Sequence, residues 1–160
     1  MTAIRVGLGV DLHIRAEGKP LWLGGVEFPG EPGLAAHSDG DVICHALADA
    51  LLGAAGLGDL GQHFPETDPQ NEGMRGLDLL GQVVDLLGRH DSAALSCDMT
   101  FLGARPTLAP SRDRIRANVA SALGIEVDAV SVKATRPEGL GLSGDGAACL
   151  AVALVRTGGE

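Results

Sequence analysis

The sequence predicts an α/β protein that folds as a single domain over residues 1–160. Two patterns predict this class: segments whose apolar residues alternate, as in strands, and segments whose apolar residues recur every three or four positions, as in helices. With 160 residues, the chain is long enough to bury about 70% of its unfolded surface in one core. Because the sequence has no Tyr, one Trp and three Phe, that core must consist mainly of Leu, Val, Ile and Ala.

The first predicted strand covers residues 5–13 and ends in two polar side chains, Asp11 and His13. Alternate residues of a strand share a face, so these two side chains point the same way. On its own, this pattern also fits an exposed strand end. The segments that follow are a hairpin over residues 19–28, which turns at Gly24-Gly25, and a loop over residues 31–33.

A helix is predicted over residues 41–55, with Ser38 as its N-cap and Asp41 as the acid of a short capping box. One side of this helix is apolar. The other side carries His45, with a carboxylate one turn before it and Asp49 one turn after it. Free N–H groups in the first turn, next to an imidazole, would suit a phosphate. The helix therefore offers both a candidate metal ligand and a candidate anion site.

The rest of the chain alternates loops with regular segments. Residues 56–76 have little periodicity, and long irregular segments inside a domain are usually functional. Arg112 and Arg116 lie one turn apart and are interpreted as a solvated helix face. The other predicted elements are helices over residues 77–87 and 111–123, strands over 92–102, 130–134 and 147–155, and a glycine-rich loop over 138–146.

Asp11, His13 and His45 form a candidate set of three metal ligands. Two imidazoles and one carboxylate suit zinc, and three protein ligands leave a fourth position open, as in catalytic zinc sites. Asp49, on the same helix, is a candidate acceptor for the second ring N–H of His45. A histidine within a helix is also commonly a packed or solvated residue, so spacing alone leaves the metal site open.

Charge and cysteine content narrow the class of partner. The net charge of −9 argues against nucleic acid and anionic membrane surfaces, because both bind basic faces. The three cysteines are widely spaced and form neither a disulfide framework nor a structural zinc motif, which favours a reducing cytoplasm. The apolar segment over residues 2–10 contains an arginine and is too short for a signal peptide or a membrane span.

Several segments together resemble the 2-C-methyl-D-erythritol 2,4-cyclodiphosphate synthases of non-mevalonate isoprenoid biosynthesis. The resemblance covers nearly the whole chain in the family's order, and it is specific because the segments occur jointly. The segments are Gly-Val-Asp-Leu-His at residues 9–13, Ala-His-Ser-Asp-Gly-Asp at 36–41, His-Ala-Leu-Ala-Asp-Ala-Leu-Leu at 45–52, Gly-Leu-Gly-Asp-Leu-Gly at 56–61, Phe-Pro-Glu-Thr-Asp-Pro at 64–69 and Val-Lys-Ala-Thr at 132–135.

The resemblance implies a two-layer subunit with a mixed four-stranded sheet and helices on one side, assembled as a homotrimer with active sites between subunits. It also implies a lyase that converts 4-diphosphocytidyl-2-C-methyl-D-erythritol 2-phosphate to 2-C-methyl-D-erythritol 2,4-cyclodiphosphate and CMP. The substrate's own 2-phosphate attacks the β-phosphorus, so such a protein supplies alignment and charge neutralisation rather than a nucleophile.

The resemblance further implies roles for individual residues. Asp11, His13 and His45 would bind one Zn²⁺ per subunit, and Glu138 would help to hold a second divalent ion, Mg²⁺ or Mn²⁺. His37 would be catalytic by favouring the transition state. The implied substrate-binding residues are Asp11, His13, His37, Ser38 and Glu138, with Asp59, Gly61, Phe64 and Asp68 around the methylerythritol and Gly103, Ala104, Pro106 and Thr135 around the cytidine.

Some positions depart from the family pattern. Arg136 stands where the family has a catalytic threonine, and its guanidinium would either stabilise the same phosphoryl charge or block that position. Thr107 replaces the family's usual lysine. Near the C-terminus, a Gly-Arg-Gly-Glu-Gly run is shortened to Gly144-Asp145-Gly146, and Leu150 replaces a frequent acid. The last two changes predict a more apolar cavity along the trimer axis.

Two other functions stay open on the sequence. One is a non-catalytic trimer that binds zinc and a nucleotide or isoprenoid phosphate, which Arg136 and the shortened glycine run motivate. The other is a metal-dependent phosphohydrolase, in which a zinc-bound water attacks in place of the substrate phosphate.

Overall fold

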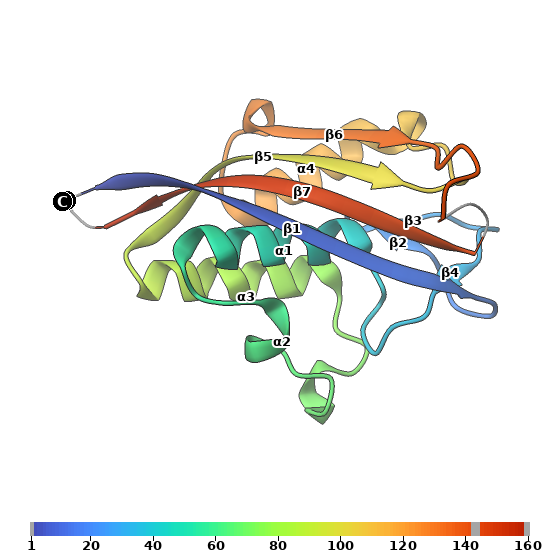
Figure 1. Cartoon of the computed structure of the whole chain (residues 1–160), viewed down its shortest axis with the longest axis horizontal. Coiled ribbons are helices and arrows are strands. Elements are labelled where there is room, and N and C mark those ends of the chain that lie inside the picture. The colour runs from blue at the N-terminus through green and yellow to red at the C-terminus, as the bar shows by residue number, and fades with distance from the viewer. Residues whose placement is uncertain (1, 142–144, 159–160) are drawn as a thin grey trace.

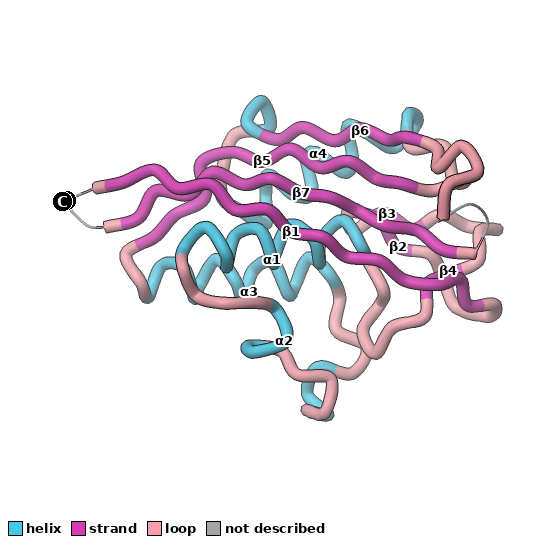
Figure 2. Tube along the Cα trace, in the orientation of Figure 1, coloured by secondary structure: helices cyan, strands magenta, loops and turns pink. Residues whose placement is uncertain are grey.

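A five-stranded mixed sheet forms one layer of the molecule, and the long helices lie on one side of it (Figures 1 and 2). The computed structural model describes residues 2–141 and 145–158. The strand order is β4-β1-β7-β5-β6, with β5 and β6 parallel and the other neighbours antiparallel. The strands are β1 (Ala3–Ala16), β4 (Gly33–Leu34), β5 (Ser92–Leu102), β6 (Val130–Thr135) and β7 (Gly146–Thr157).

The four long strands match the predicted sheet, and the fifth is a correction. Strand β4 has two residues, which pair with Arg15 and Ala16 at the end of β1. It forms because the chain returns past the end of β1 before it enters the first helix. The predicted hairpin is confirmed as a separate two-stranded sheet of β2 (Trp22–Leu23) and β3 (Val26–Glu27), with Gly24 and Gly25 in the turn at positive φ.

The three predicted long helices are confirmed. The segment expected to be irregular also contains a one-turn helix and a 3₁₀ turn, and the second long helix runs past Gly88 because the backbone N–H of His90 still bonds to helical carbonyls. The helical elements are α1 (Val42–Ala55), α2 (Leu60–His63), α3 (Gly76–Arg89), α4 (Arg112–Leu123) and the 3₁₀ turns η1 (Pro69–Asn71), η2 (Ala109–Ser111) and η3 (Val127–Ala129).

Helix α1 is buried on nearly all sides, so the side that carries His45 has little contact with solvent. Leu52 has no exposed surface, and His45 is 6% exposed. The reason is that α1 packs against β1 and β7 on one side and against α3 on the other. Among the described residues, no helix combines the length and the apolar character required to cross a bilayer.

Two glycines let β1 approach α1 closely. Gly7 and Gly9 face the helix, and a Cβ at Gly9 would lie 1.9 Å from the Ala46 carbonyl oxygen and 2.6 Å from the Ala50 nitrogen. Asp11 and His13 follow at two-residue steps on the same face of β1. The close approach therefore brings these two side chains to the level of His45, the residue that precedes Ala46.

We expect Gly9→Ala to lower the free energy of unfolding by about 3 kcal/mol, because strand and helix must separate to admit the methyl group. Urea denaturation followed by circular dichroism measures the change. Gly81→Ala is the matched control, since a Cβ at Gly81 in α3 meets no atom within 4 Å. That control should raise the free energy of unfolding by about 0.5–1 kcal/mol, and equal effects of the two substitutions would contradict the close-packing argument.

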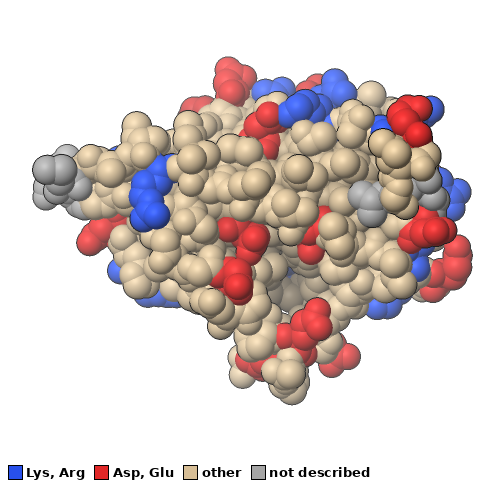
Figure 3. Space-filling model, viewed as in Figure 1, with Lys and Arg blue, Asp and Glu red and all other residues tan. Residues whose placement is uncertain are grey.

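The other face of the sheet is apolar and open to solvent in the single chain. In the view of Figure 3, a broad uncharged area covers the upper middle of this face, and acidic side chains lie below it and at the edges. Nine large apolar side chains on these two strands are between 38% and 68% exposed: Ile4, Val6, Leu8, Val10, Leu12, Ile14, Leu150, Val152 and Leu154. We call this set the apolar sheet face. Isolated monomers rarely expose so continuous an apolar area.

Candidate metal centre and substrate pockets

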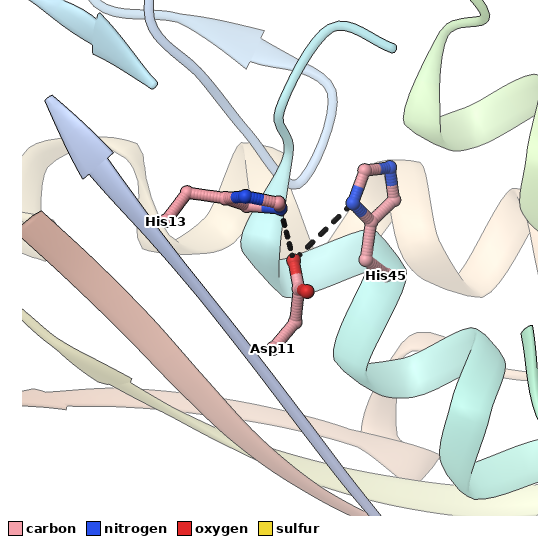
Figure 4. Close-up of side chains that lie close together, drawn as sticks. All are labelled: Asp11, His13 and His45. Atoms are coloured by element: carbon pink, nitrogen blue, oxygen red, sulfur yellow. Dashed lines mark hydrogen bonds and ion pairs between the residues drawn. The ribbon is translucent and has the colours of Figure 1, made fainter. Parts of the chain in front are cut away.

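Asp11, His13 and His45 converge as the sequence predicts (Figure 4). One ligand atom from each of the three side chains lies within 4.8 Å of the other two. Asp11 Oδ2 is 3.0 Å from His13 Nε2 and 3.2 Å from His45 Nδ1. The two imidazole rings meet nearly edge to face, with an interplanar angle of 76°.

The electrostatics of the cluster favour positive charge at its centre. Burial by itself would raise the pKa of the Asp11 carboxyl, but the interactions with His13 and His45 outweigh it and lower that pKa to about 2. Burial would likewise lower the pKa of His45, yet the hydrogen bond and charge of Asp11 raise it. Asp11 is therefore a carboxylate at neutral pH, with two ring nitrogens facing it.

The environment of the His13 ring indicates that these residues fit a metal ion. The Nε2 atom of this ring is buried and has no hydrogen-bond partner among the described residues, because the nearby Asp11 carboxylate is close but not aligned for a hydrogen bond. A buried polar atom without a partner is costly. A cation between Asp11, His13 and His45 would satisfy this nitrogen, so the donor set fits a divalent metal with mixed nitrogen and oxygen ligands.

The second ring nitrogen of His45 lies against Ser38, and the prediction that Asp49 takes this place is wrong. His45 Nε2 is 3.1 Å from Ser38 Oγ. Asp49 instead accepts a hydrogen bond from the Leu60 backbone N–H at 3.1 Å. It turns away from His45 because the start of α2 crosses next to it.

The start of α1 also differs from the prediction. The N-cap is Asp41, whose Oδ1 accepts hydrogen bonds from the N–H groups of Ile43 and Cys44. The same carboxylate accepts hydrogen bonds from Gly24 and Gly25 in the hairpin, at 2.9 and 2.8 Å. The N–H groups of Ile43 and Cys44 in the first turn of α1 are therefore occupied by Asp41. They are not available for the predicted anion site at the start of the helix.

We expect Asp49→Ala to release the start of α2 and to lower the free energy of unfolding by about 1 kcal/mol, since one hydrogen bond to a carboxylate is lost. Gly61 and Phe64 line a cavity beside Asp11, His13 and His45, so the KM of a substrate bound there should rise more than kcat falls. Urea denaturation and steady-state kinetics measure these effects. Asp85→Ala, at an exposed position of α3, is the control and should change neither quantity.

A cavity of about 180 Å³ opens beside the cluster, and we call it the metal cavity. The predicted residues that it brings together are Asp11, His13, His37, Ser38, His45, Gly61 and Phe64. The lining residues that the sequence analysis missed are Ala36, Leu60, Glu66, Asn71, Met74 and Leu79. Most of them lie in or beside the predicted irregular segment, and that location is the signal that could have marked them.

A second pocket of about 170 Å³ lies where β5 and β6 end and α4 begins. It unites the predicted residues Gly103, Ala104, Pro106, Thr135 and Arg136. Thr107, Leu108, Ala109, Arg112 and Ala134 also line it and were missed. The metal cavity and the second pocket share no lining residue, so one chain keeps the predicted metal and cytidine residues apart.

Three predicted site residues line neither pocket. Asp59 caps α2 through the Gln62 N–H, and Asp68 caps η1 through the Gln70 N–H. Glu138 is exposed, with a φ of 52°. Their predicted roles toward substrate and a second ion stay predictions. In the shortened glycine run, Gly144 lies outside the described residues. Leu150 lies on the apolar sheet face at 40% exposure, and the predicted cavity along a trimer axis stays a prediction.

The fold and the site define an α/β protein with a candidate mononuclear metal centre that opens into a cavity. The model of the YgbB family matches residues 4–157, and the chain belongs to this family. The resemblance stated from the sequence is thereby confirmed.

Three relatives show how far the similarity extends. A 2-C-methyl-D-erythritol 2,4-cyclodiphosphate synthase from Symbiobacterium thermophilum is 49% identical over 152 residues, which cover 94% of this chain and 97% of that protein. A solved structure of such a synthase with CDP bound has a TM-score of 0.87 and 36% identity, and covers 94% of this chain and 99% of the other. The bifunctional IspDF from Campylobacter jejuni has a TM-score of 0.92 and 36% identity, over 99% of this chain and 43% of that chain.

Proposed function

We propose that this protein is a lyase that forms 2-C-methyl-D-erythritol 2,4-cyclodiphosphate and CMP from 4-diphosphocytidyl-2-C-methyl-D-erythritol 2-phosphate, in non-mevalonate isoprenoid biosynthesis. The observation that carries the proposal is the convergence of Asp11, His13 and His45 beside a cavity, in a member of the YgbB family. The names of the curated relatives and the CDP complex of a related structure support the choice of substrate.

In the proposed reaction, an oxygen of the 2-phosphate attacks the β-phosphorus, and the bond from that phosphorus to the bridging oxygen of CMP breaks. CMP leaves with the bonding electrons. When bound, Zn²⁺ at the cluster and a second divalent ion, Mg²⁺ or Mn²⁺, held with the help of Glu138 supply charge neutralisation for the diphosphate. The net charge of −9 makes such compensation necessary.

The protein's own residues hold the substrate in line for this attack. Gly61 and Phe64 of the metal cavity take the methylerythritol, together with Asp59 and Asp68 from the same segment. His37 and Ser38 donate hydrogen bonds to phosphate oxygens at the edge of that cavity. In the second pocket, Gly103, Ala104, Pro106 and Thr135 bind the cytidine, and Arg136 stabilises phosphoryl charge as it develops.

The same proposal includes a homotrimer with active sites between subunits. Two observations support it. The apolar sheet face is exposed in the single chain, and packing of β1 and β7 around a three-fold axis would bury it. The metal cavity and the second pocket are separate in one chain, so a site that uses both requires a neighbouring subunit.

We also propose that residues 1–160 act as one domain, because a single cluster of buried residues links the sheet with α1, α3 and α4. A cytoplasmic location fits the three cysteines, which are free and buried.

Phosphorus NMR of the purified protein with the diphosphocytidyl substrate, with and without chelator, tests the proposed reaction. The expected result is signals of the cyclic diphosphate and CMP, which fail to develop after chelation and return when Zn²⁺ and Mg²⁺ are added. Linear hydrolysis products would identify a phosphohydrolase. Tight CDP binding without turnover would identify a non-catalytic binding protein.

A further inference from the structure

The second pocket differs in charge from the metal cavity. Among the described residues, its charged lining side chains are Arg112 and Arg136, and no carboxylate lines it. Asp11 and Glu66, by contrast, line the metal cavity. The chain has 21 acidic and 12 basic residues, so a pocket with two guanidiniums and no carboxylate runs against the overall charge. Such a pocket attracts an anion, because the two like charges otherwise repel each other.

Neither guanidinium is neutralised by another of the described residues. Within residues 2–141 and 145–158, Arg112 and Arg136 form no ion pair and no side-chain hydrogen bond. The carboxylate nearest to Arg112 in sequence, Asp113, pairs with Arg116 at 3.5 Å. Both arginines are exposed, so both can meet a ligand.

Arg112 and Arg116, which lie one turn apart on α4, make different contacts. The Arg116 guanidinium donates hydrogen bonds to the carbonyl oxygens of Val130 at 2.8 Å and Val127 at 3.1 Å. Arg116 therefore ties α4 to η3 and β6, whereas Arg112, one turn earlier, faces the second pocket. The interpretation of this pair as a solvated helix face is therefore wrong for Arg116, which is part-buried and bonded to backbone carbonyls, whereas Arg112 is exposed as predicted.

We propose that Arg112 is a further substrate-binding residue, which together with Arg136 binds the phosphate next to the cytidine. The inference rests on the proposed function, because it places a pyrimidine nucleotide in the second pocket. Guanidinium groups form paired, charge-assisted hydrogen bonds with phosphate oxygens. Thr107 lines the same pocket and carries no charge, so Arg112 and Arg136 are the cationic side chains of its described lining. The pocket then selects a nucleotide over its nucleoside.

Isothermal titration calorimetry of CMP and of cytidine into the full-length protein tests this role. Arg112→Ala should weaken CMP binding about tenfold, as expected for the loss of a charge-assisted hydrogen bond. Cytidine binding should stay within about twofold of the wild-type value, since cytidine has no phosphate. Arg112→Lys, which keeps the charge without the planar fork, should recover part of the CMP affinity.

Arg114→Ala is the matched control. Arg114 is an exposed arginine of the same helix that does not line the pocket, so its removal changes net charge equally and should leave CMP binding unchanged. Three results would overturn the assignment while leaving the proposed function intact: wild-type CMP affinity in Arg112→Ala, equal losses for CMP and cytidine, or equal losses in the two alanine variants. If the wild-type protein binds neither CMP nor CDP, the proposed function fails as well.

Discussion

His45→Ala should abolish stoichiometric metal binding and lower turnover by at least about 10³-fold, while the chain still folds. The imidazole is one of three converging ligands, and the two that remain, Asp11 and His13, cannot complete a site on their own. Because the proposed phosphoryl transfer depends on charge neutralisation rather than on a protein nucleophile, the rate should fall when the metal is lost. Elemental analysis of the purified variant and phosphorus NMR of product formation measure the two losses.

The effect of His45→Ala on stability can be measured separately from its effect on metal binding. His45 is 6% exposed, so its truncation leaves a small void and should cost roughly 1–3 kcal/mol of unfolding free energy when both proteins are measured with chelator. His90→Ala is the control, since His90 is exposed and lines neither pocket. It should retain full metal content and turnover. A His45→Ala protein that still carries one zinc ion per chain would refute the ligand assignment.

The regular elements could be predicted from the sequence because each has a strong local period. The strand over residues 92–102 has the predicted bounds, and Gly124 ends α4 in the left-handed conformation typical of a C-cap. The start of α1 could not be predicted in the same way, because Ser38 and Asp41 are both good N-cap residues. What decides between them is the hairpin, whose Gly24 N–H bonds to Asp41 from a distant part of the chain.

The candidate site shows the same division between local and tertiary causes. A two-residue period placed Asp11 and His13 on one face, and the structure confirms it. The approach of His45 depends on the contact between Gly9 and Ala46, which a strand period does not reveal. Periodicity also cannot separate Arg112 from Arg116, because the two share a helix face. Their different roles arise from what lies opposite each of them after folding.

Leu8→Glu should convert the proposed trimer to monomers and lower turnover at least about 100-fold. Leu8 is 63% exposed in the single chain, so the monomer tolerates glutamate in contact with water. In a trimer the same carboxylate would be buried against two neighbours, at a cost of several kcal/mol per charge. Light scattering after size exclusion measures the mass. Val127→Glu is the control: Val127 is 41% exposed but lies on η3, so the trimer and the turnover should persist.

Mixing two inactive variants shows whether each active site is formed by two neighbouring subunits. His45→Ala damages the metal cavity, and Ala104→Trp fills the second pocket at an exposed position. If each site joins the cavity of one subunit to the pocket of the next, a random one-to-one mixture contains about one quarter intact sites, and turnover returns to that level. If one chain supplies both the metal cavity and the second pocket of a site, every site in the mixture carries one of the two substitutions. The mixture, refolded together, then stays inactive.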